Sequence, residues 1–120
     1  MASQDAHLAQ YRLLREDAFR ESNSLPTRVE TLFLAAYHLV DACAARENVH
    51  IGKHQHVRRE LSENDRIFGA RTEAVWREFQ ELETRIRPKF IYGTKWTEGD
   101  FPKALAVFGT LERLCLEVLR

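Results

Sequence analysis

"PTRVETLFLAAYHLVDACAARE", residues 26–47, is the most apolar periodic stretch of this 120-residue chain, and it decides the expected fold. Its apolar residues recur at steps of four, three, four and three, which places on one helix face Val29, Phe33, Ala36, Val40 and Cys43. Further alanines in the same stretch would let a neighbouring helix approach closely. The stretch therefore predicts a buried helix against which the rest of the chain packs.

The segments on either side show the same helical spacing. It predicts further helices over residues 4–21, 53–62, 70–87 and 100–119. Pro26 suits the first turn of the central helix, and Pro88 is expected to end the fourth one. No strand-like alternation exceeds four residues, and no linker divides the chain. The expected fold is a single all-α domain over residues 1–120.

The expected architecture is an antiparallel up-and-down bundle of four long helices with one short helix inserted as the third. Short connections make consecutive helices antiparallel. If the short helix reverses direction like the others, segments 48–53 and 88–99 lie at the same end of the bundle.

Composition excludes some classes of protein. Eighteen basic and eighteen acidic residues give zero formal net charge, so bulk attraction to nucleic acid or to an anionic membrane is not expected. The amino-terminal residues show no secretion signal, and no apolar run approaches the roughly 20 residues of a membrane span. The expected location is cytoplasmic, without membrane association. Cys43 and Cys115 are expected to be buried, reduced thiols.

Two segments are locally basic, and both lack acids. They are residues 48–59 and 84–96, and the second also carries aromatic side chains that could stack on bases. The candidate residues for binding RNA or a nucleotide are Lys53, Arg58, Arg59, Arg85, Arg87, Lys89, Tyr92 and Lys95. The alternative is that the aromatics close one end of the bundle and the cations are only solvated.

The histidines of "ENVHIGKHQHVRREL", residues 47–61, raise the question of a metal site. We expect His50 in a loop, His54 at the start of the short helix on its core side, and His56 pointing away. The three rings should then diverge, so no metal site and no cofactor are expected. Val57 and Leu61 should face the core, which turns the two arginines after Val57 towards the flank or solvent.

Two other features allow more than one interpretation. His38, with Tyr37 and Asp41, could form a general acid–base set, or could be a core-edge histidine satisfied by a neighbour. Trp76 is expected at the margin of the core, where a large aromatic often contributes to an interface between chains. The second feature keeps open a non-catalytic interaction module.

Several segments resemble HEPN domains. "AAYHLVDACAARENVHIGKHQHVRREL", residues 35–61, is similar to the family's small-residue helix and the His-containing pattern that follows it. "RIRPKFIYG", residues 85–93, looks like the family's Arg-rich helix end and turn, and the last helix also fits. The resemblance covers about residues 26–118 and implies a HEPN-like helical bundle.

The resemblance also implies a function and partners. Many HEPN proteins are dimeric, metal-independent endoribonucleases, often toxins paired with a minimal nucleotidyltransferase antitoxin. Their Arg-x(4–6)-His motif is missing here, because three residues separate Arg46 from His50 and seven separate it from His54. The leading expectation is a homodimeric protein that binds RNA or a nucleotide-bearing partner. The enzymatic alternative is an endoribonuclease that uses Arg46 with His50 or His54.

Overall fold

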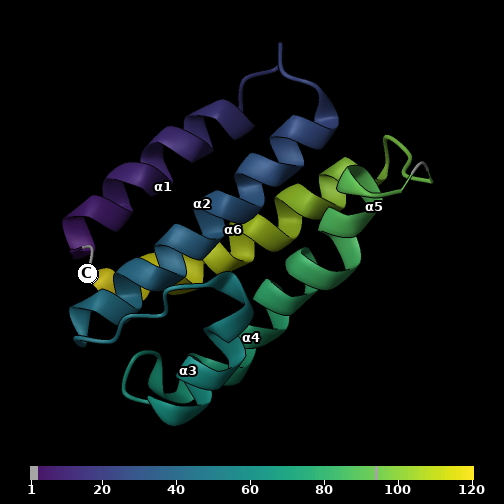
Figure 1. Cartoon of the computed structure of the whole chain (residues 1–120). Coiled ribbons are helices and arrows are strands. Elements are labelled where there is room, and N and C mark those ends of the chain that lie inside the picture. Colours follow the sequence, from purple (N-terminus) through teal and green to yellow (C-terminus); the bar gives the residue numbers. More distant parts are fainter. Residues whose placement is uncertain (1–2, 94) are drawn as a thin grey trace.

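The computed structural model describes residues 3–93 and 95–120, and within them it is all-helical, without a β-strand (Figure 1). The all-α prediction is confirmed. The α-helices are α1 (Gln4–Ala18), α2 (Leu25–Arg46), α3 (Val57–Glu63), α4 (Thr72–Gln80), α5 (Arg87–Ile91) and α6 (Asp100–Leu119). Short 3₁₀ turns are η1 (His54–His56) and η2 (Gly69–Arg71), and a π-helical turn, η3 (Glu81–Ile86), joins α4 to α5.

The four long passes of the chain form an up-and-down bundle in which α4, η3 and α5 together make the third pass (Figure 1). Arg28 near the start of α2 donates to the carbonyl of Ala18 at the end of α1 (2.8 Å), so these two helices are antiparallel. Arg46 at the end of α2 donates to the carbonyl of Val118 near the end of α6 (2.7 Å), so α2 and α6 run parallel. The amino-terminal end of α1 and the carboxyl-terminal end of α6 consequently lie at the same end of the bundle.

The ends of α2 are defined by side-chain and backbone caps. The hydroxyl of Ser24 accepts from the N–H of Thr27 (3.3 Å), and Pro26 lies in the first turn, as predicted. At the other end Asn48 adopts a left-handed conformation (φ 61°), and Val49 donates to a carbonyl five residues back. These contacts form a Schellman motif, which stops the helix where the sequence predicted.

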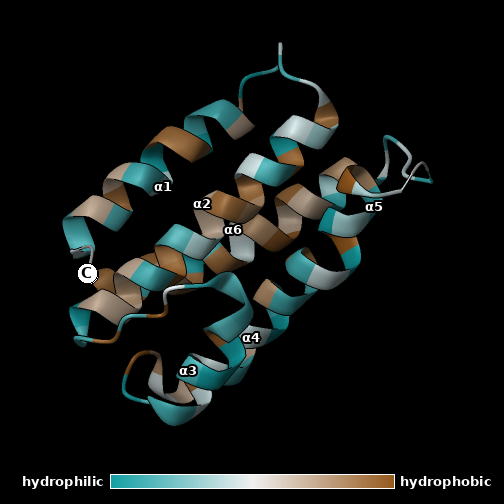
Figure 2. Cartoon of the chain, in the orientation of Figure 1, coloured by the Kyte–Doolittle hydropathy of each residue, from teal (hydrophilic) through white to brown (hydrophobic). Residues whose placement is uncertain are grey.

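The core is one continuous apolar cluster centred on α2, whose buried face is contacted by α1, α6 and α5 (Figure 2). Its largest fully buried aromatic side chains are Phe33, Phe79 and Phe108. Val57 and Leu61 of α3 also face the core, and Trp76 is partly buried at its margin, as predicted. Over the described residues, none of the helices combines the length and apolar character that crossing a membrane would require.

The expectation that segments 48–53 and 88–99 share one end of the bundle is wrong (Figure 1). After the left-handed Asn48, residues 49–53 form an extended segment, interrupted by Gly52 at positive φ, that runs back along α2 and buries Val49 and Ile51. The helix α3 then returns to the end that this segment left. The extended segment therefore acts as a partial pass of its own. As a result, α4 starts at that end and carries α5 to the opposite one.

Pro88 does not end the fourth helix, contrary to the prediction. The π-helical turn η3 precedes it, and the N–H of Arg87 donates to the carbonyl of Leu82, five residues back. In a regular helix the ring of Pro88 would collide with the carbonyl four residues earlier. The wider π turn moves that carbonyl away, so the helix continues as α5 to Ile91.

Cys43 and Cys115 are buried, reduced thiols on α2 and α6, as predicted. The thiol of Cys43 donates to the backbone carbonyl of Cys115 (3.5 Å). A hydrogen bond between the Cys115 and Cys43 thiols, together with burial, raises the pKa of Cys115 well above the ordinary value for a thiol. A high pKa leaves little thiolate, which is the reactive form.

Because both side chains are fully buried, we expect the two thiols to react with an aromatic disulfide reagent at least about a hundredfold more slowly in the folded protein than in guanidinium. Thiol release followed by absorbance at pH 8 measures this. Rapid modification of either cysteine under native conditions would show that the α2–α6 contact opens readily.

Candidate functional site

The ring of Phe33 lies under two polar side chains that come from distant parts of the chain. His54 of η1 meets the ring edge to face, with centroids 5.1 Å apart and planes at 88°. The guanidinium carbon of Arg87 lies 4.8 Å from the centre of the same ring. Phe33 is itself fully buried. An imidazole and a guanidinium are thus held on one rigid aromatic support, which we call the Phe33 site.

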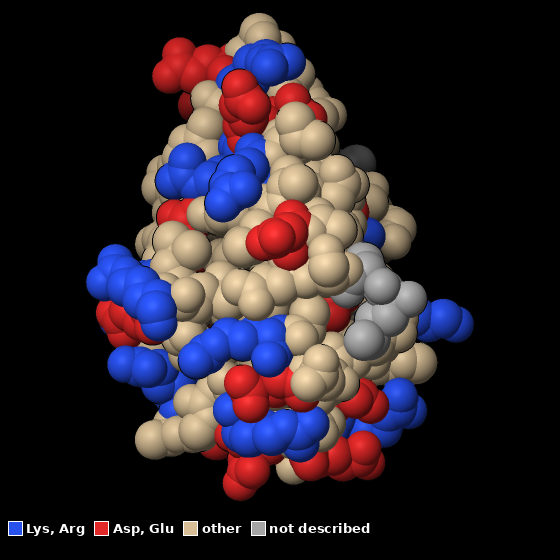
Figure 3. All heavy atoms as spheres, turned by 90° about the vertical axis from the view of Figure 1, so that its left-hand side faces the viewer, with Lys and Arg blue, Asp and Glu red and all other residues tan. Residues whose placement is uncertain are grey.

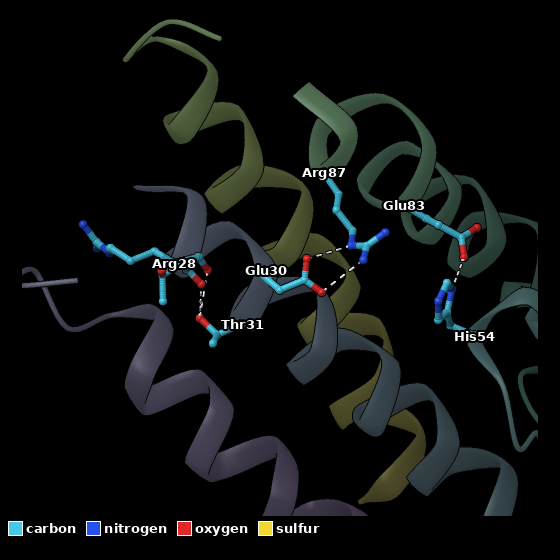
Figure 4. A network of polar contacts seen from close by, with 7 residues as sticks. Arg28, Glu30, Thr31, His54, Glu83 and Arg87 are labelled. Atoms are coloured by element: carbon cyan, nitrogen blue, oxygen red, sulfur yellow. Dashed lines mark hydrogen bonds and ion pairs between the residues drawn. The ribbon is translucent and has the colours of Figure 1, made fainter. Parts of the chain in front are cut away.

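His54 is oriented by a carboxylate. Its Nδ1 lies 2.7 Å from Oε2 of Glu83, which projects from the π-helical turn (Figure 4). The side chains are partly buried, at 28% and 16% exposure, so solvent only partly screens the contact. With Nδ1 engaged by Glu83, Nε2 is the atom of His54 left to exchange a proton or contact a ligand.

Arg87 is also oriented by a carboxylate. Its Nε and Nη2 donate to the two oxygens of Glu30 on α2, at 2.9 and 3.2 Å, in a bidentate pair (Figure 4). Burial alone would lower the pKa of Arg87, but the hydrogen bonds and charge of Glu30 outweigh it and raise the pKa. The guanidinium therefore remains charged, in a fixed orientation. Tyr92, which is 76% exposed, lies 5.9 Å from it.

Tyr37 extends the Phe33 site along α2. Its ring centroid is 6.2 Å from that of His54, with the planes nearly perpendicular. Burial, followed by the charge of Asp41 and a hydrogen bond to it, raises the pKa of Tyr37 to about 12. The hydroxyl is therefore protonated at neutral pH.

The Phe33 site borders a shallow groove. The groove has a volume of about 280 Å³ and lies between the start of α2 and the end of α5. It is mostly apolar and is lined by Pro26, Thr27, Glu30, Thr31 and Ile91. Because Glu30 belongs both to this groove and to the Arg87 pair, a flat ring in the groove would lie next to the guanidinium.

The cations predicted to bind nucleic acid do not form an acid-free surface. Several of these cations pair with a carboxylate, either on the same helix or from a distant part of the sequence. Arg87 is one of them. The remaining pairs are Arg58–Glu73 (3.2 Å), Arg59–Glu60 (3.4 Å), Arg85–Glu81 (3.6 Å) and Lys89–Asp100 (3.5 Å). Lys53 and Lys95 are exposed. On the face drawn in Figure 3, positive and negative side chains are likewise interspersed.

The structure does not bring Arg46 next to His54. Arg46 donates to the carbonyl of Val118. It lies nine residues, or roughly 13 Å, further along α2 than Tyr37, which is the residue of that helix near His54. His50 is exposed in the extended segment between them. Of the three residues considered for catalysis, only His54 belongs to the Phe33 site. The arginine that accompanies it is Arg87.

Three residues of the Phe33 site were not recognised in the sequence. Glu30 and Glu83 lie outside the two basic segments, and Phe33 read only as a core residue. No local pattern connects them, because their partners are 57 and 29 residues away. One signal was present. Val49 and Ile51 alternate with polar residues, which is the pattern of an extended, half-buried segment, but two such residues are too few to distinguish this segment from a loop.

The described residues contain no group of three or more His, Cys, Asp or Glu side chains that could hold a metal ion. The groups that the Phe33 site presents are a fixed cation, an oriented imidazole and nearby aromatic rings. Such a set can bind a phosphate and can exchange a proton with a ligand. No protein-family model, curated protein or solved structure matches this chain.

Proposed function

We propose that this chain is a HEPN-like helical bundle that binds single-stranded RNA at the Phe33 site. The observation that carries the proposal is the pair of contacts of His54 and Arg87 with one buried ring, 5.1 and 4.8 Å from its centre. Each of these two side chains is held by its own carboxylate. The sequence resemblance to HEPN domains supports the same reading.

Arg87 is the residue that would receive a phosphate. A guanidinium has five N–H donors, and Glu30 accepts from two of the nitrogens, so donors remain for a second anion. Tyr92 is placed to stack on a base, and the groove beside Glu30 offers an apolar surface for another. Glu30 and Glu83 oppose a negative ligand, so we expect affinity in the micromolar range, as for sequence-independent binding.

The second candidate function is metal-independent cleavage of RNA, and the Glu83–His54 contact favours it. Nε2 of His54 would accept the proton of a ribose 2′-hydroxyl as its oxygen attacks the adjacent phosphorus. Arg87 would stabilise the charge on the phosphoryl oxygens as the bond to the 5′-oxygen breaks. The products are a 2′,3′-cyclic phosphate and a 5′-hydroxyl, and the leaving oxygen takes up a proton.

The family resemblance also supplies candidate protein partners. On that basis we include in the proposal a second copy of this chain and a minimal nucleotidyltransferase antitoxin. Neither partner is needed for the contacts at Phe33. The RNA proposal is therefore tested with the chain alone.

The test is fluorescence anisotropy with a labelled 12-nucleotide RNA of mixed sequence, at low and moderate salt. We expect wild-type binding that weakens as salt rises, because binding to phosphates releases counterions. Arg87→Lys keeps the charge but loses the bidentate fork, and His54→Gln keeps a polar side chain. Each should weaken binding by about tenfold, which corresponds to about 1.4 kcal/mol.

The matched control is Arg113→Ala. Arg113 is an exposed arginine on α6 that pairs only with Glu117 (3.4 Å), so its loss should leave RNA affinity unchanged. Absence of wild-type binding at low salt, or equal losses in Arg113→Ala and Arg87→Lys, would refute the site. The same samples, incubated with chelator and resolved on a gel, decide between binding alone and cleavage that disappears in His54→Gln.

A further inference from the structure

A second polar cluster lies between α1 and α2, away from the Phe33 ring. His7 of α1 is buried, at 7% exposure, and its Nδ1 lies 3.1 Å from Nδ1 of His38 on α2. Its other ring nitrogen, Nε2, lies 3.3 Å from Oδ2 of Asp41, which is only 2% exposed. Nε2 of His7 has no hydrogen-bond partner within the described residues, so Asp41 contacts the ring by charge alone. Asp41, His7 and His38 thus form a line of polar groups across the two helices, which we call the His7 chain.

The contact between the two imidazoles allows only some protonation states. One Nδ1 must donate and the other must accept, whereas a protonated imidazole donates from both nitrogens. The 3.1 Å contact therefore cannot persist once both rings are charged. Asp41 can balance one positive charge, and its Oδ1 accepts no hydrogen bond within the described residues. The His7 chain accommodates one proton on its two rings but not two.

We propose that the His7 chain is an acid-sensitive lock that holds α1 on α2. When α1 is docked, the second proton is excluded. When α1 is released, both imidazoles are solvated and each can take up its own proton. Acidification therefore favours release. The contacts of the lock join α1 to α2 and do not require RNA, although the ring of Tyr37 connects His38 to His54 of the Phe33 site.

The pH window follows from His38. Burial, and then the charge of His7, lower the pKa of His38, while Asp41 partly opposes the shift. A histidine whose pKa is lowered in the docked state contributes stability that is fully present above its ordinary value of about 6.5. That stability is lost as the pH falls from 6.5 towards the lowered value. Because release of α1 lets the histidines bind one extra proton, the equilibrium constant for docking falls by up to about tenfold per pH unit in that window.

Other charged groups face this part of the bundle. On α2, the ring of Tyr37 packs at a tilt against His38, and His54 of η1 lies near the same Tyr37 ring. From α6, the carboxylate of Glu112 accepts from the hydroxyl of Tyr11 and from Nε of Arg15 (2.6 Å), and it holds the middle of α1. At the far end of α1, Arg28 donates to a backbone carbonyl. Glu112 is the group that could supply a competing pH dependence, so it defines the control.

The test is amide hydrogen exchange of the full chain, followed by NMR between pH 7.5 and 5.5 and corrected for intrinsic rates. We expect the protection of α1 amides to fall about tenfold over this range, while core amides of α2 and α6 stay protected. His38→Gln removes the second titrating ring and should reduce the fall to less than threefold. Glu112→Gln should loosen α1 at every pH but keep the wild-type pH dependence.

Three hydrogen-exchange results would overturn the lock. One is α1 protection that does not change with pH in the wild type. Another is simultaneous loss of protection throughout the protein, which would indicate global acid unfolding. The third is a pH dependence that survives in His38→Gln and vanishes in Glu112→Gln. An NMR titration of the His38 ring protons in the wild-type protein tests the lock without a variant. A His38 pKa at or above about 6.5 would contradict the proposal.

Discussion

Phe33→Ala is expected to lower the free energy of unfolding by about 3–5 kcal/mol, the usual cost of truncating a fully buried phenylalanine. Phe33 is completely buried and packs on Phe79, with ring centroids 5.6 Å apart. For a domain whose total stability is about 5–15 kcal/mol, the loss is a large fraction. Urea denaturation followed by circular dichroism measures it.

The matched control is Phe108→Ala. Phe108 is buried to the same extent, but it lies on α6. Its ring packs near that of Phe19, the residue that follows α1. The two variants should be destabilised to a similar degree. Only Phe33→Ala removes the ring that supports His54 and Arg87, so only it should abolish RNA binding under conditions where both variants are folded. Equal binding by the two folded variants would separate the ring from the proposed function.

Breaking the Arg87–Glu30 pair is expected to cost about 1–3 kcal/mol, because the partner that remains is partly buried without its hydrogen bonds. The side chains are 17% and 27% exposed, so solvent offsets only part of the loss. Arg87→Ala, Glu30→Ala and the double variant form a double-mutant cycle. The double variant should lose less stability than the two single variants together, because the second change removes a group that the first had left unpaired.

Arg85→Ala is the control for this cycle. Arg85 lies two residues away on the same pass, but its side chain is 77% exposed and pairs only with Glu81 of the preceding turn. An exposed pair of this kind contributes little, so the change should stay within about 0.5 kcal/mol. A cycle with no coupling between Arg87 and Glu30 would mean that their bidentate geometry does not persist in solution.

Much of the fold could be predicted from the sequence because helical periodicity is a local property. The apolar spacing of residues 26–47 predicted α2, and the same spacing located the other long passes. Val57 and Leu61 were placed on the core side of the short helix for the same reason. Each of these inferences needs only the angle between neighbouring side chains on a helix.

The direction of the fourth helix could not be read in this way. It depends on whether residues 48–53 form a loop or a partial pass, and a six-residue extended segment has too short a pattern to decide between them. Pro88 misled for a related reason. A proline ends a regular helix, but a π turn before it removes the steric conflict, and the sequence gives no local sign of that turn.

The candidate site was predictable only in part, because a charge is defined by its neighbours in space. Residues 84–96 contain no acid, yet Arg87 meets Glu30 and Lys89 meets Asp100. His54 was correctly placed on the core side, but the glutamate that orients it comes from another helix. The sequence therefore identifies the candidate charged side chains, but it does not show which of them are paired with an opposite charge in the fold.

The π-helical turn has a consequence for sequence comparison. Hydrogen bonding to the fifth residue, instead of the fourth, accommodates one residue more than a regular helix would need between Glu81 and Ile86. A relative one residue shorter here would keep its later side chains in the same directions, whereas a regular helix of equal length would rotate each of them by about 100°. Its counterpart of Arg87 would no longer face Glu30. An ungapped alignment with such a helix would then match arginines that point in different directions, so equivalence at this position should be judged by the ring beneath the arginine.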